Sequence, residues 1–334
     1  MSNTDTTESQ RKGSHGSHGP IGRHAIEAFA LLGHKTRLEI LLAIWKAHDL
    51  RADDNAVAFS QIRKRVEHDD PGNLRYHLEQ LDGQFVRQQA DRGGYELRVP
   101  AQQLIQTVIA GAGVHDEYLE PTDIDQQCPF CGAQTVMSYR EGILFWACHE
   151  CGGMTPGQDF ASFDPPGPLT AHPFDPAGLD EWTPDELRAA STVVGRRRLR
   201  SAFDGVCPNC SSPVDSWFDW CPDHNSDGCD DCGLRFGTTA HFRCRTCDHH
   251  DGSTPKHLAL FHPAVVSFYD NHGISTRVRA DDFEHARRIY SLMLSHQVTV
   301  VEDDPIRVTV TASQDDEMIR LTFDETVRVV DVCR

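Results

Sequence analysis

The sequence predicts an α+β multidomain protein with a helical N-terminal domain, a central metal-binding ribbon and a C-terminal multi-cysteine region that ends in a small antiparallel sheet. Three observations carry this prediction. Helical apolar spacing followed by a hairpin signal occupies residues 21–115. Pairs of metal-type ligands separated by two residues recur from Cys128 to Cys247. Short alternating apolar runs close the chain. Residues 1–20, rich in Gly, Ser and His, are expected to be a disordered tail.

Acidic residues dominate the composition, but unevenly. The 334 residues carry a formal charge of -18, and only five of the basic residues are lysines. Residues 21–110 hold 12 Lys+Arg against 12 Asp+Glu, so the acidic surplus lies beyond them. A Lys-poor, Asp-rich surface resembles that of halophilic proteins, whose self-repulsion is screened because the Debye length is about 3 Å at 1 M salt. The balanced N-terminal segment is the part best suited to approach an anionic partner.

Cysteine usage indicates a reduced compartment. All twelve cysteines follow residue 127, mostly in pairs separated by two residues, which favours metal over disulfides. No apolar run approaches the ~20 residues of a membrane span, and no apolar signal core follows the N-terminus. We therefore expect a cytoplasmic metalloprotein with no membrane association.

The N-terminal segment has the pattern of a helix-turn-helix. Apolar residues recur at helical spacing from Ala25, and Thr36 can cap a second helix. Ser60 opens a short helix that ends near Val66, and Asp70 and Pro71 begin the next helix as its cap and first residue. That last helix carries an apolar stripe of Leu74, Leu78 and Leu81.

Two strand-like runs follow, at 86–90 and 95–99, joined by Asp91-Arg92-Gly93-Gly94. Helices followed by such a hairpin form a winged helix-turn-helix. The segments 29–41 and 73–81 resemble those of ArsR-like winged-helix transcriptional regulators. The resemblance implies a homodimer on double-stranded DNA, with the first helix and the helix 102–109 at the seam. Residues 1–127 contain no Cys, so the thiolate sensing sites of that family cannot form here.

Candidate DNA contacts fall into two sets. Asn73, Arg75 and Tyr76 lie on the face opposite the leucine stripe, where they can enter a major groove, whereas His77 beside the stripe is expected to pack inside. Arg63, Lys64 and Arg65 in the preceding helix, with Arg92 at the hairpin tip, are expected to contact phosphates or to form a solvated face. At high salt the release of counterions contributes less to the free energy of DNA binding, so Asn73, Arg75 and Tyr76 should matter more than the basic residues.

The central motif is a zinc ribbon over residues 116–154. Cys128 and Cys131 precede, and Cys148 and Cys151 follow, a strand pair predicted at 135–139 and 143–147. Four thiolates with these spacings form a closed structural zinc site with no open position for chemistry. The glycine after each cysteine pair, Gly132 and Gly152, is expected to turn backbone amides toward the sulfurs.

Residues 155–183, rich in Pro, Gly and Asp, are predicted to be an extended linker. Thr183 to Glu186 form a capping box, so a helix should run from 184 to about Phe203. Its basic residues Arg196, Arg197, Arg198 and Arg200 are interpreted as a solvated face, with nucleic-acid contact as the alternative.

A second cysteine block lies within the last predicted domain, 184–334. Its candidate ligands are Cys207, Cys210, Cys221, His224, Cys229, Cys232, Cys244 and Cys247. Together with the ribbon they suffice for about three zinc ions, with two also possible, and Cys333 is left as a free thiol. Spacing permits consecutive pairing, 207/210 with 221/224, or interleaved pairing, 207/210 with 229/232. His241 or His249 could replace His224.

Beyond this block, residues 262–273 read as a short helix ended by Gly273, and four apolar runs from Val298 to Val332 predict an antiparallel sheet. The whole order of parts resembles a group of archaeal regulators of halophiles. The leading hypothesis is a sequence-specific, dimeric transcriptional regulator with structural zinc. The alternative is a general transcription-machinery factor that docks on RNA polymerase, because a winged helix followed by a ribbon resembles the archaeal counterpart of the factor IIE alpha subunit.

An enzyme is not expected. The sequence has no His-x-x-x-His with Glu, no phosphate-cradling glycine loop and no nucleophile elbow, and only Asp223, His224 and Asn225 offer a place to look for an open zinc.

Overall fold

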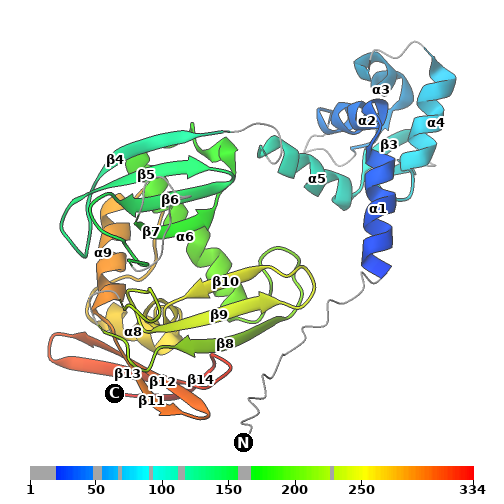
Figure 1. The fold of residues 1–334 in the computed structure, drawn as a ribbon. Coiled ribbons are helices and arrows are strands. Elements are labelled where there is room, and N and C mark those ends of the chain that lie inside the picture. Colours follow the sequence, from blue (N-terminus) through cyan, green and yellow to red (C-terminus); the bar gives the residue numbers. More distant parts are fainter. Residues whose placement is uncertain are drawn as a thin grey trace, which may run out of the picture. The chain divides into compact units, whose positions relative to one another are not determined.

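The computed structural model of the chain describes residues 20–47, 55–66, 70–89, 93–111, 117–156, 167–225 and 229–334. The predicted tail up to residue 19 and the hairpin-tip residue Arg92 lie outside them. The chain divides into two compact units, Met1–Ile109 and Ala110–Arg334. Both mix helices with small antiparallel sheets (Figure 1). No helix in the described ranges is long and apolar enough to cross a membrane.

In its described residues, unit 1 packs five helices against a three-stranded sheet. Its elements are α1 (Pro20–Leu32), α2 (Lys35–Trp45), β1 (Val57–Ala58), α3 (Phe59–Val66), α4 (Pro71–Leu81), β2 (Val86–Gln89), β3 (Gly94–Leu97) and α5 (Val99–Ile109). The antiparallel sheet has the order β1-β3-β2, so the two predicted strands pair, although the second begins at Gly94 and ends at Leu97, and β1 pairs with its other edge.

In unit 1 the residue that caps α4 is the predicted one, whereas the residue that caps α2 is not. Asp70 caps α4, because its Oδ1 accepts from the backbone N–H of Gly72 at 2.8 Å, and Pro71 follows as predicted. The expectation that Thr36 caps α2 is wrong. His34 is the cap, and its Nδ1 accepts from the N–H of Thr36 at 3.2 Å. The imidazole nitrogen replaces the hydroxyl as the acceptor for a free N–H of the first turn.

The core of unit 1 is one apolar cluster. Ile40, Leu41 and Ile44 of α2 pack with the buried stripe of α4, and Ile105 of α5 joins them. The stripe consists of Leu74, Leu78 and Leu81, as predicted, and His77 is buried beside it. Burying this face of α4 leaves its opposite face exposed.

Unit 2 begins with a four-stranded antiparallel sheet in chain order, made of β4 (Leu119–Gln127), β5 (Gln134–Arg140), β6 (Ile143–Cys148) and β7 (Pro168–Pro173). The predicted ribbon pair is confirmed as β5 and β6. The expected linker 155–183 instead contains β7 and the short helix η1 (Pro176–Gly178). Strand β6 buries Leu144, Phe145 and Trp146 in succession, so both of its faces are covered, and it lies inside the sheet between β5 and β7.

Helix α6 (Pro184–Phe203) follows, with the predicted capping box at Thr183 and Glu186. The interpretation of its basic residues as a solvated face is wrong for Arg196 and Arg200 and, because of its hydrogen bond to Asn209, for Arg198 as well. The guanidinium of Arg196 lies 4.9 Å from the centroid of the Phe261 ring, and Arg200 donates to the carbonyl of Phe261. Both arginines pack against this distant phenylalanine because their stems cover apolar surface there.

The rest of unit 2 contains two more sheets and three helices within the described ranges. Strands β8 (Val214–Trp220), β9 (Thr238–Cys244) and β10 (His250–Ser253) form a sheet in the order β10-β9-β8. Helices α7 (Pro255–Ala259), α8 (Pro263–Asn271) and α9 (Phe283–Ser295) precede the meander β11 (Gln297–Asp303), β12 (Ile306–Gln314), β13 (Glu317–Phe323) and β14 (Val329–Cys333). The predicted helix before Gly273 and the predicted C-terminal sheet are both confirmed.

Candidate metal centres

Twelve side chains with metal-ligand chemistry gather in three groups of four, all in unit 2. The first centre contains Cys128, Cys131, Cys148 and Cys151. The second contains Cys207, Cys210, Cys244 and Cys247. The third contains Cys221, His224, Cys229 and Cys232. Within each group the ligand atoms lie within 4.8 Å of one another, and none of these cysteines forms a disulfide. All twelve predicted ligands are therefore brought into sites with the geometry to hold a metal ion.

Distances between sulfurs fit a metal better than a disulfide. Cys131 and Cys148 are 3.5 Å apart in the first centre, Cys210 and Cys244 3.4 Å in the second, and Cys221 and Cys229 3.6 Å in the third. A disulfide needs about 2.05 Å. Four ligands at about 2.3 Å from a tetrahedral ion would be about 3.8 Å apart. The sulfurs thus lie near the edges of such a tetrahedron.

In the second block the first and last ligand pairs, 207/210 and 244/247, share one centre, and the two pairs between them, 221/224 and 229/232, share another. Both pairings left open by the sequence differ from this nested pairing and are wrong. Strands β8 and β9 explain this arrangement. At one end of their ladder Val214 faces Cys244, so Cys207 and Cys210 before β8 meet Cys244 and Cys247 after β9. At the other end Trp220 faces Thr238, so Cys221, His224, Cys229 and Cys232 all lie in the connection between the strands. One antiparallel hairpin therefore carries a centre at each end.

Backbone N–H groups point at the sulfurs in the cysteine loops. The N–H of Glu150 donates to Cys148 Sγ at 3.4 Å, and the N–H groups of Thr246 and Cys247 donate to Cys244 Sγ at 3.3 and 3.4 Å. The Cys247 N–H is the largest of the effects that lower the pKa of the Cys244 thiol to about 6. These bonds favour thiolate, which is the form that binds metal.

Glycines shape the loops, although not all as predicted. Gly132 has a φ of 76°, which fits the turn expected after Cys131. After Cys151 the left-handed residue is Gly153, with a φ of 56°, rather than Gly152. A Cβ at Gly152 would meet the Cα of Pro156 at 2.2 Å, so this glycine is needed for a close backbone approach.

His224 is oriented as a ligand of the third centre. Its Nδ1 lies 3.6 Å from Cys232 Sγ, and its Nε2 lies 3.3 Å from the carbonyl oxygen of Arg235, to which an Nε2–H can donate. That arrangement leaves Nδ1 free for a metal and fixes the ring. His241 and His249, the alternatives considered from the sequence, instead face the carboxylates of Asp219 and Asp251.

A family model matches the part of the chain that contains all three centres. It covers residues 125–329, more than half of the sequence, and describes a domain of unknown function, DUF7351. The chain belongs to the DUF7351 family. A second model, for a domain of unknown function named DUF7347, matches residues 25–108. No curated protein and no solved structure matches the chain. All twelve ligands and helix α6 thus lie within the DUF7351 segment.

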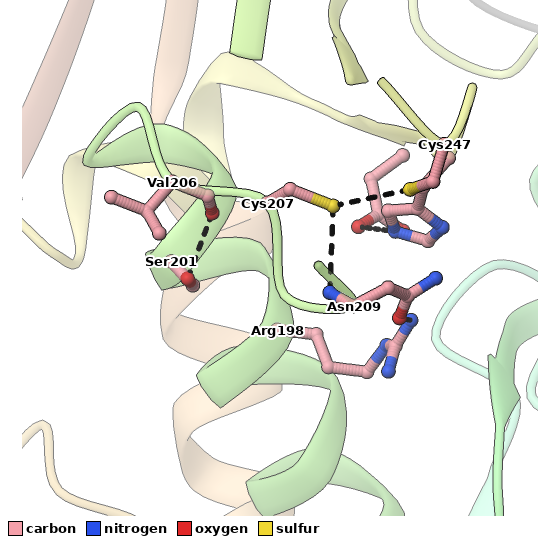
Figure 2. Close-up of polar contacts among 8 residues, drawn as sticks. Arg198, Ser201, Val206, Cys207, Asn209 and Cys247 are labelled. Atoms are coloured by element: carbon pink, nitrogen blue, oxygen red, sulfur yellow. Dashed lines mark hydrogen bonds and ion pairs between the residues drawn. The ribbon is translucent and has the colours of Figure 1, made fainter. Parts of the chain in front are cut away.

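In this DUF7351 segment, α6 supports the second centre through a short chain of contacts (Figure 2). Arg198 donates from Nη2 to Oδ1 of Asn209 at 2.8 Å, and the Asn209 N–H donates to Cys207 Sγ at 3.4 Å. Cys207 in turn lies 3.6 Å from Cys247. The hydroxyl of Ser201 donates to the carbonyl of Val206 at 2.8 Å and holds the chain that leads into the loop. Arg198 is therefore a positioning residue rather than part of a solvated face.

Arg235 links the first and third centres, and sequence reasoning missed it. Its carbonyl accepts from His224, while its guanidinium lies 4.5 Å from the centroid of Phe130, which lies between two ligands of the first centre. Its Nε donates to the carbonyl of Gly153 at 3.0 Å, and its N–H donates to that of Met154 at 2.8 Å. A single arginine in the spacer between Cys232 and Cys244 carries no sequence signal. Its role follows only from the packing of the two loops.

The predicted DNA contacts lie on the surface of unit 1. Asn73, Arg75 and Tyr76 are exposed on α4, and Arg63, Lys64 and Arg65 are exposed on α3. The guanidinium of Arg75 lies 5.4 Å from the centroid of the Phe59 ring, so it is held above the start of α3. The two sets therefore occupy adjacent helices.

Proposed function

We propose that this protein is a sequence-specific DNA-binding transcriptional regulator, whose unit 1 is a winged helix-turn-helix and whose unit 2 is a zinc-stabilised scaffold. The observation that carries the proposal is the two-sided character of α4. One side buries Leu74, Leu78 and Leu81, whereas the other exposes Asn73, Arg75 and Tyr76. A helix with such an exposed polar face, preceded by a short helix and followed by a hairpin, is suited to reading base edges in a major groove.

The basic residues of α3 add to this support. Arg63, Lys64 and Arg65 occupy the last turn of that helix, where cations can reach phosphates beside the groove. On the hairpin, Arg87 is paired with Glu96. Charge on α3 is therefore available for DNA, whereas Arg87 is engaged within the sheet.

A homodimer is part of the proposal. On α1 the side chains of Ile26 and Phe29 are exposed by 71% and 73%, and on α5 Val108 and Ile109 are also exposed. Apolar side chains exposed to this extent on two helices favour association. The resemblance to ArsR-like regulators implies a dimer seam on the corresponding helices. A dimer with two-fold symmetry would bind a DNA site whose sequence has two-fold symmetry.

We also propose that the metal is zinc, with three ions per chain. Eleven thiolates and one imidazole make up the three centres. A hard cation such as magnesium or calcium prefers oxygen ligands, whereas zinc accepts both four-cysteine and three-cysteine, one-histidine sets. Because every centre offers four protein ligands, none keeps an open position, which supports a structural role.

The experiment that tests the function is a map of chromosomal occupancy, taken in cells so that the native salt is kept. A small number of sharp peaks sharing a two-fold motif is the expected result. Occupancy at most active promoters would favour the general transcription factor instead, and the absence of enrichment would refute DNA binding. Elemental analysis of the purified protein should give three zinc ions per chain.

A further inference from the structure

A cavity of about 200 Å³ lies in unit 2, and none of the metal ligands lines it. It is lined by β7, α6, the segment from β10 into α7, and α9. Met154, which follows the last ligand of the first centre, also contributes. A cavity of about 150 Å³ can hold benzene, so this one has room for a molecule of about eight non-hydrogen atoms.

Two arginines of one helix face this cavity. Arg188, Thr192 and Arg196 line it at four-residue spacing along α6 and so form one stripe of that helix. Arg188 is only 2% exposed, and its guanidinium lies 3.9 Å from the centroid of the Trp146 ring. Arg196 is half-buried and donates to the carbonyl of Thr276 at 3.3 Å.

Neither cation has a carboxylate partner within the described ranges. Arg188 bonds to the hydroxyl of Thr192, but its Nε and Nη2 are buried without a hydrogen-bond partner there, and the same holds for Nη1 of Arg196. No Asp or Glu is among the described residues that line the cavity. The nearby carboxylate of Asp251 bonds to His249 at 2.7 Å. A buried charge without a partner is costly, and an anion would offset that cost.

Near neutral pH the two arginines are charged, and the other described side chains that line the cavity are neutral. Burial lowers the pKa of Arg188 and of Arg196 to about 10, so both stay protonated near neutral pH. Burial, and then the charge of Arg188, lowers the pKa of His172 to about 4, which leaves this imidazole uncharged. Apolar side chains complete the wall, namely Leu169, Leu260, Ile289 and Met293. The ligand that fits is therefore negative at one part and apolar at another.

We propose that this cavity binds a small organic carboxylate, held by Arg188 and Arg196 through its anionic oxygens and by the apolar wall through its hydrocarbon body. Guanidinium groups match carboxylates because their parallel N–H donors can bond both oxygens. Thr192 and the Tyr290 ring, whose centroid lies 5.4 Å from the Arg188 guanidinium, orient the first arginine toward the cavity. The proposal does not rest on DNA binding, and none of the metal ligands lines the cavity.

The test is calorimetric titration of the full-length, metal-loaded protein with sodium hexanoate, at constant sodium concentration, with sodium phosphate and sodium chloride as reference anions. Hexanoate should bind, and R196Q should weaken the association constant at least tenfold. R188Q should do the same, provided that its circular dichroism and metal content match the wild type. R197Q is the matched control on the same helix, because Arg197 is exposed and outside the cavity, and it should bind as the wild type does.

Three outcomes would overturn the proposal. Absence of hexanoate binding would mean that the cations are neutralised from within the chain. Equal binding of phosphate or chloride would mean a site for inorganic anions. Equal weakening by R196Q and R197Q would mean a nonspecific charge effect. Because R196Q alters a half-buried residue, it keeps the test decisive even where R188Q does not fold.

Discussion

The guanidinium of Arg235 lies 4.5 Å from the centroid of the Phe130 ring, so a residue next to the third centre packs against one that lies between two ligands of the first. The same guanidinium donates to the carbonyl of Gly153, beyond the last ligand of the first centre. Two loops 82 residues apart in the chain thus share one side chain. The affinities of the first and third centres for metal should therefore be coupled.

R235M tests this coupling. The variant keeps the main-chain carbonyl that accepts from His224 but loses the cation–π contact and the charged hydrogen bond, at a cost of about 2 kcal/mol. Metal release to a chromogenic chelator should accelerate for two of the three ions. The matched control is R279M, whose arginine pairs with Asp281 on the surface. Release kinetics identical to those of the wild type would show that the first and third centres are independent.

The nested pairing of the second block predicts how many metal ions a variant retains when two of its ligands are replaced. Cys210 and Cys244 belong to the same centre, so C210S/C244S should lose one metal ion and retain two. C210S/C232S removes a ligand from each of two centres and should retain one. Elemental analysis of the purified variants distinguishes these cases. Equal metal content in the two double variants would contradict the nested arrangement.

Stability should fall on acidification because of His296. This side chain is 1% exposed, and as a neutral ring it can donate from Nδ1 to the carbonyl of Lys256 at 2.9 Å while Nε2 accepts from the Tyr269 hydroxyl at 2.8 Å. Burial lowers its pKa from 6.5 to about 4. Its contribution is therefore complete above pH 6.5 and is lost as the pH falls toward 4, since the unfolded chain binds the proton first.

At pH 5.5 the loss relative to pH 7.5 is about 1.3 kcal/mol. H296Q removes the titrating group, so the difference in stability between wild type and variant should shrink by this amount between the two pH values. Denaturant unfolding at both values measures it, and comparison with the variant cancels the acid release of metal that both proteins share. A difference that does not change with pH would exclude His296 as the source.

The exposed polar residues of α4 and the exposed basic residues of α3 should affect DNA binding differently. N73A and Y76A should each cost about 1–3 kcal/mol on the specific site and relax base preference. R63A, K64A and R65A should weaken binding to all sequences, and each should reduce the salt slope by about 1 where its cation neutralises a phosphate. Titrations over a salt series, near molar salt included, separate the two effects. Equal losses of affinity from both sets at high salt would contradict a base-reading role of α4.

Local signals in the sequence were sufficient for much of the fold. The cap at Asp70, the capping box at Thr183 and the alternation from Val298 onward act over a few residues, and each predicted its element. The twelve ligands could be named because thiolate pairs two residues apart have few other uses. Their grouping in the second block could not, because it depends on the register of β8 against β9.

Long-range packing accounts for what the sequence did not reveal. Strand β7 lies in a stretch whose Pro and Gly content indicates a linker, and its pairing with the distant strand β6 leaves no local signal. Arg196 has the polarity of a surface residue, yet it covers Phe261, 65 positions away. Arg188 lies in the first half of α6 and is buried by Trp146 and Tyr290 from two other elements. None of these contacts produces a periodic pattern in the sequence.

The hairpin of β8 and β9 carries a candidate metal centre at each end, and its length sets how far apart the two lie. The seven residues of β8 span about 20 Å at about 3.3 Å per residue. A shift of the strands by even one residue would misalign both ends at once. Insertions within β8 or β9 should therefore be far less tolerated than insertions in the turns outside them.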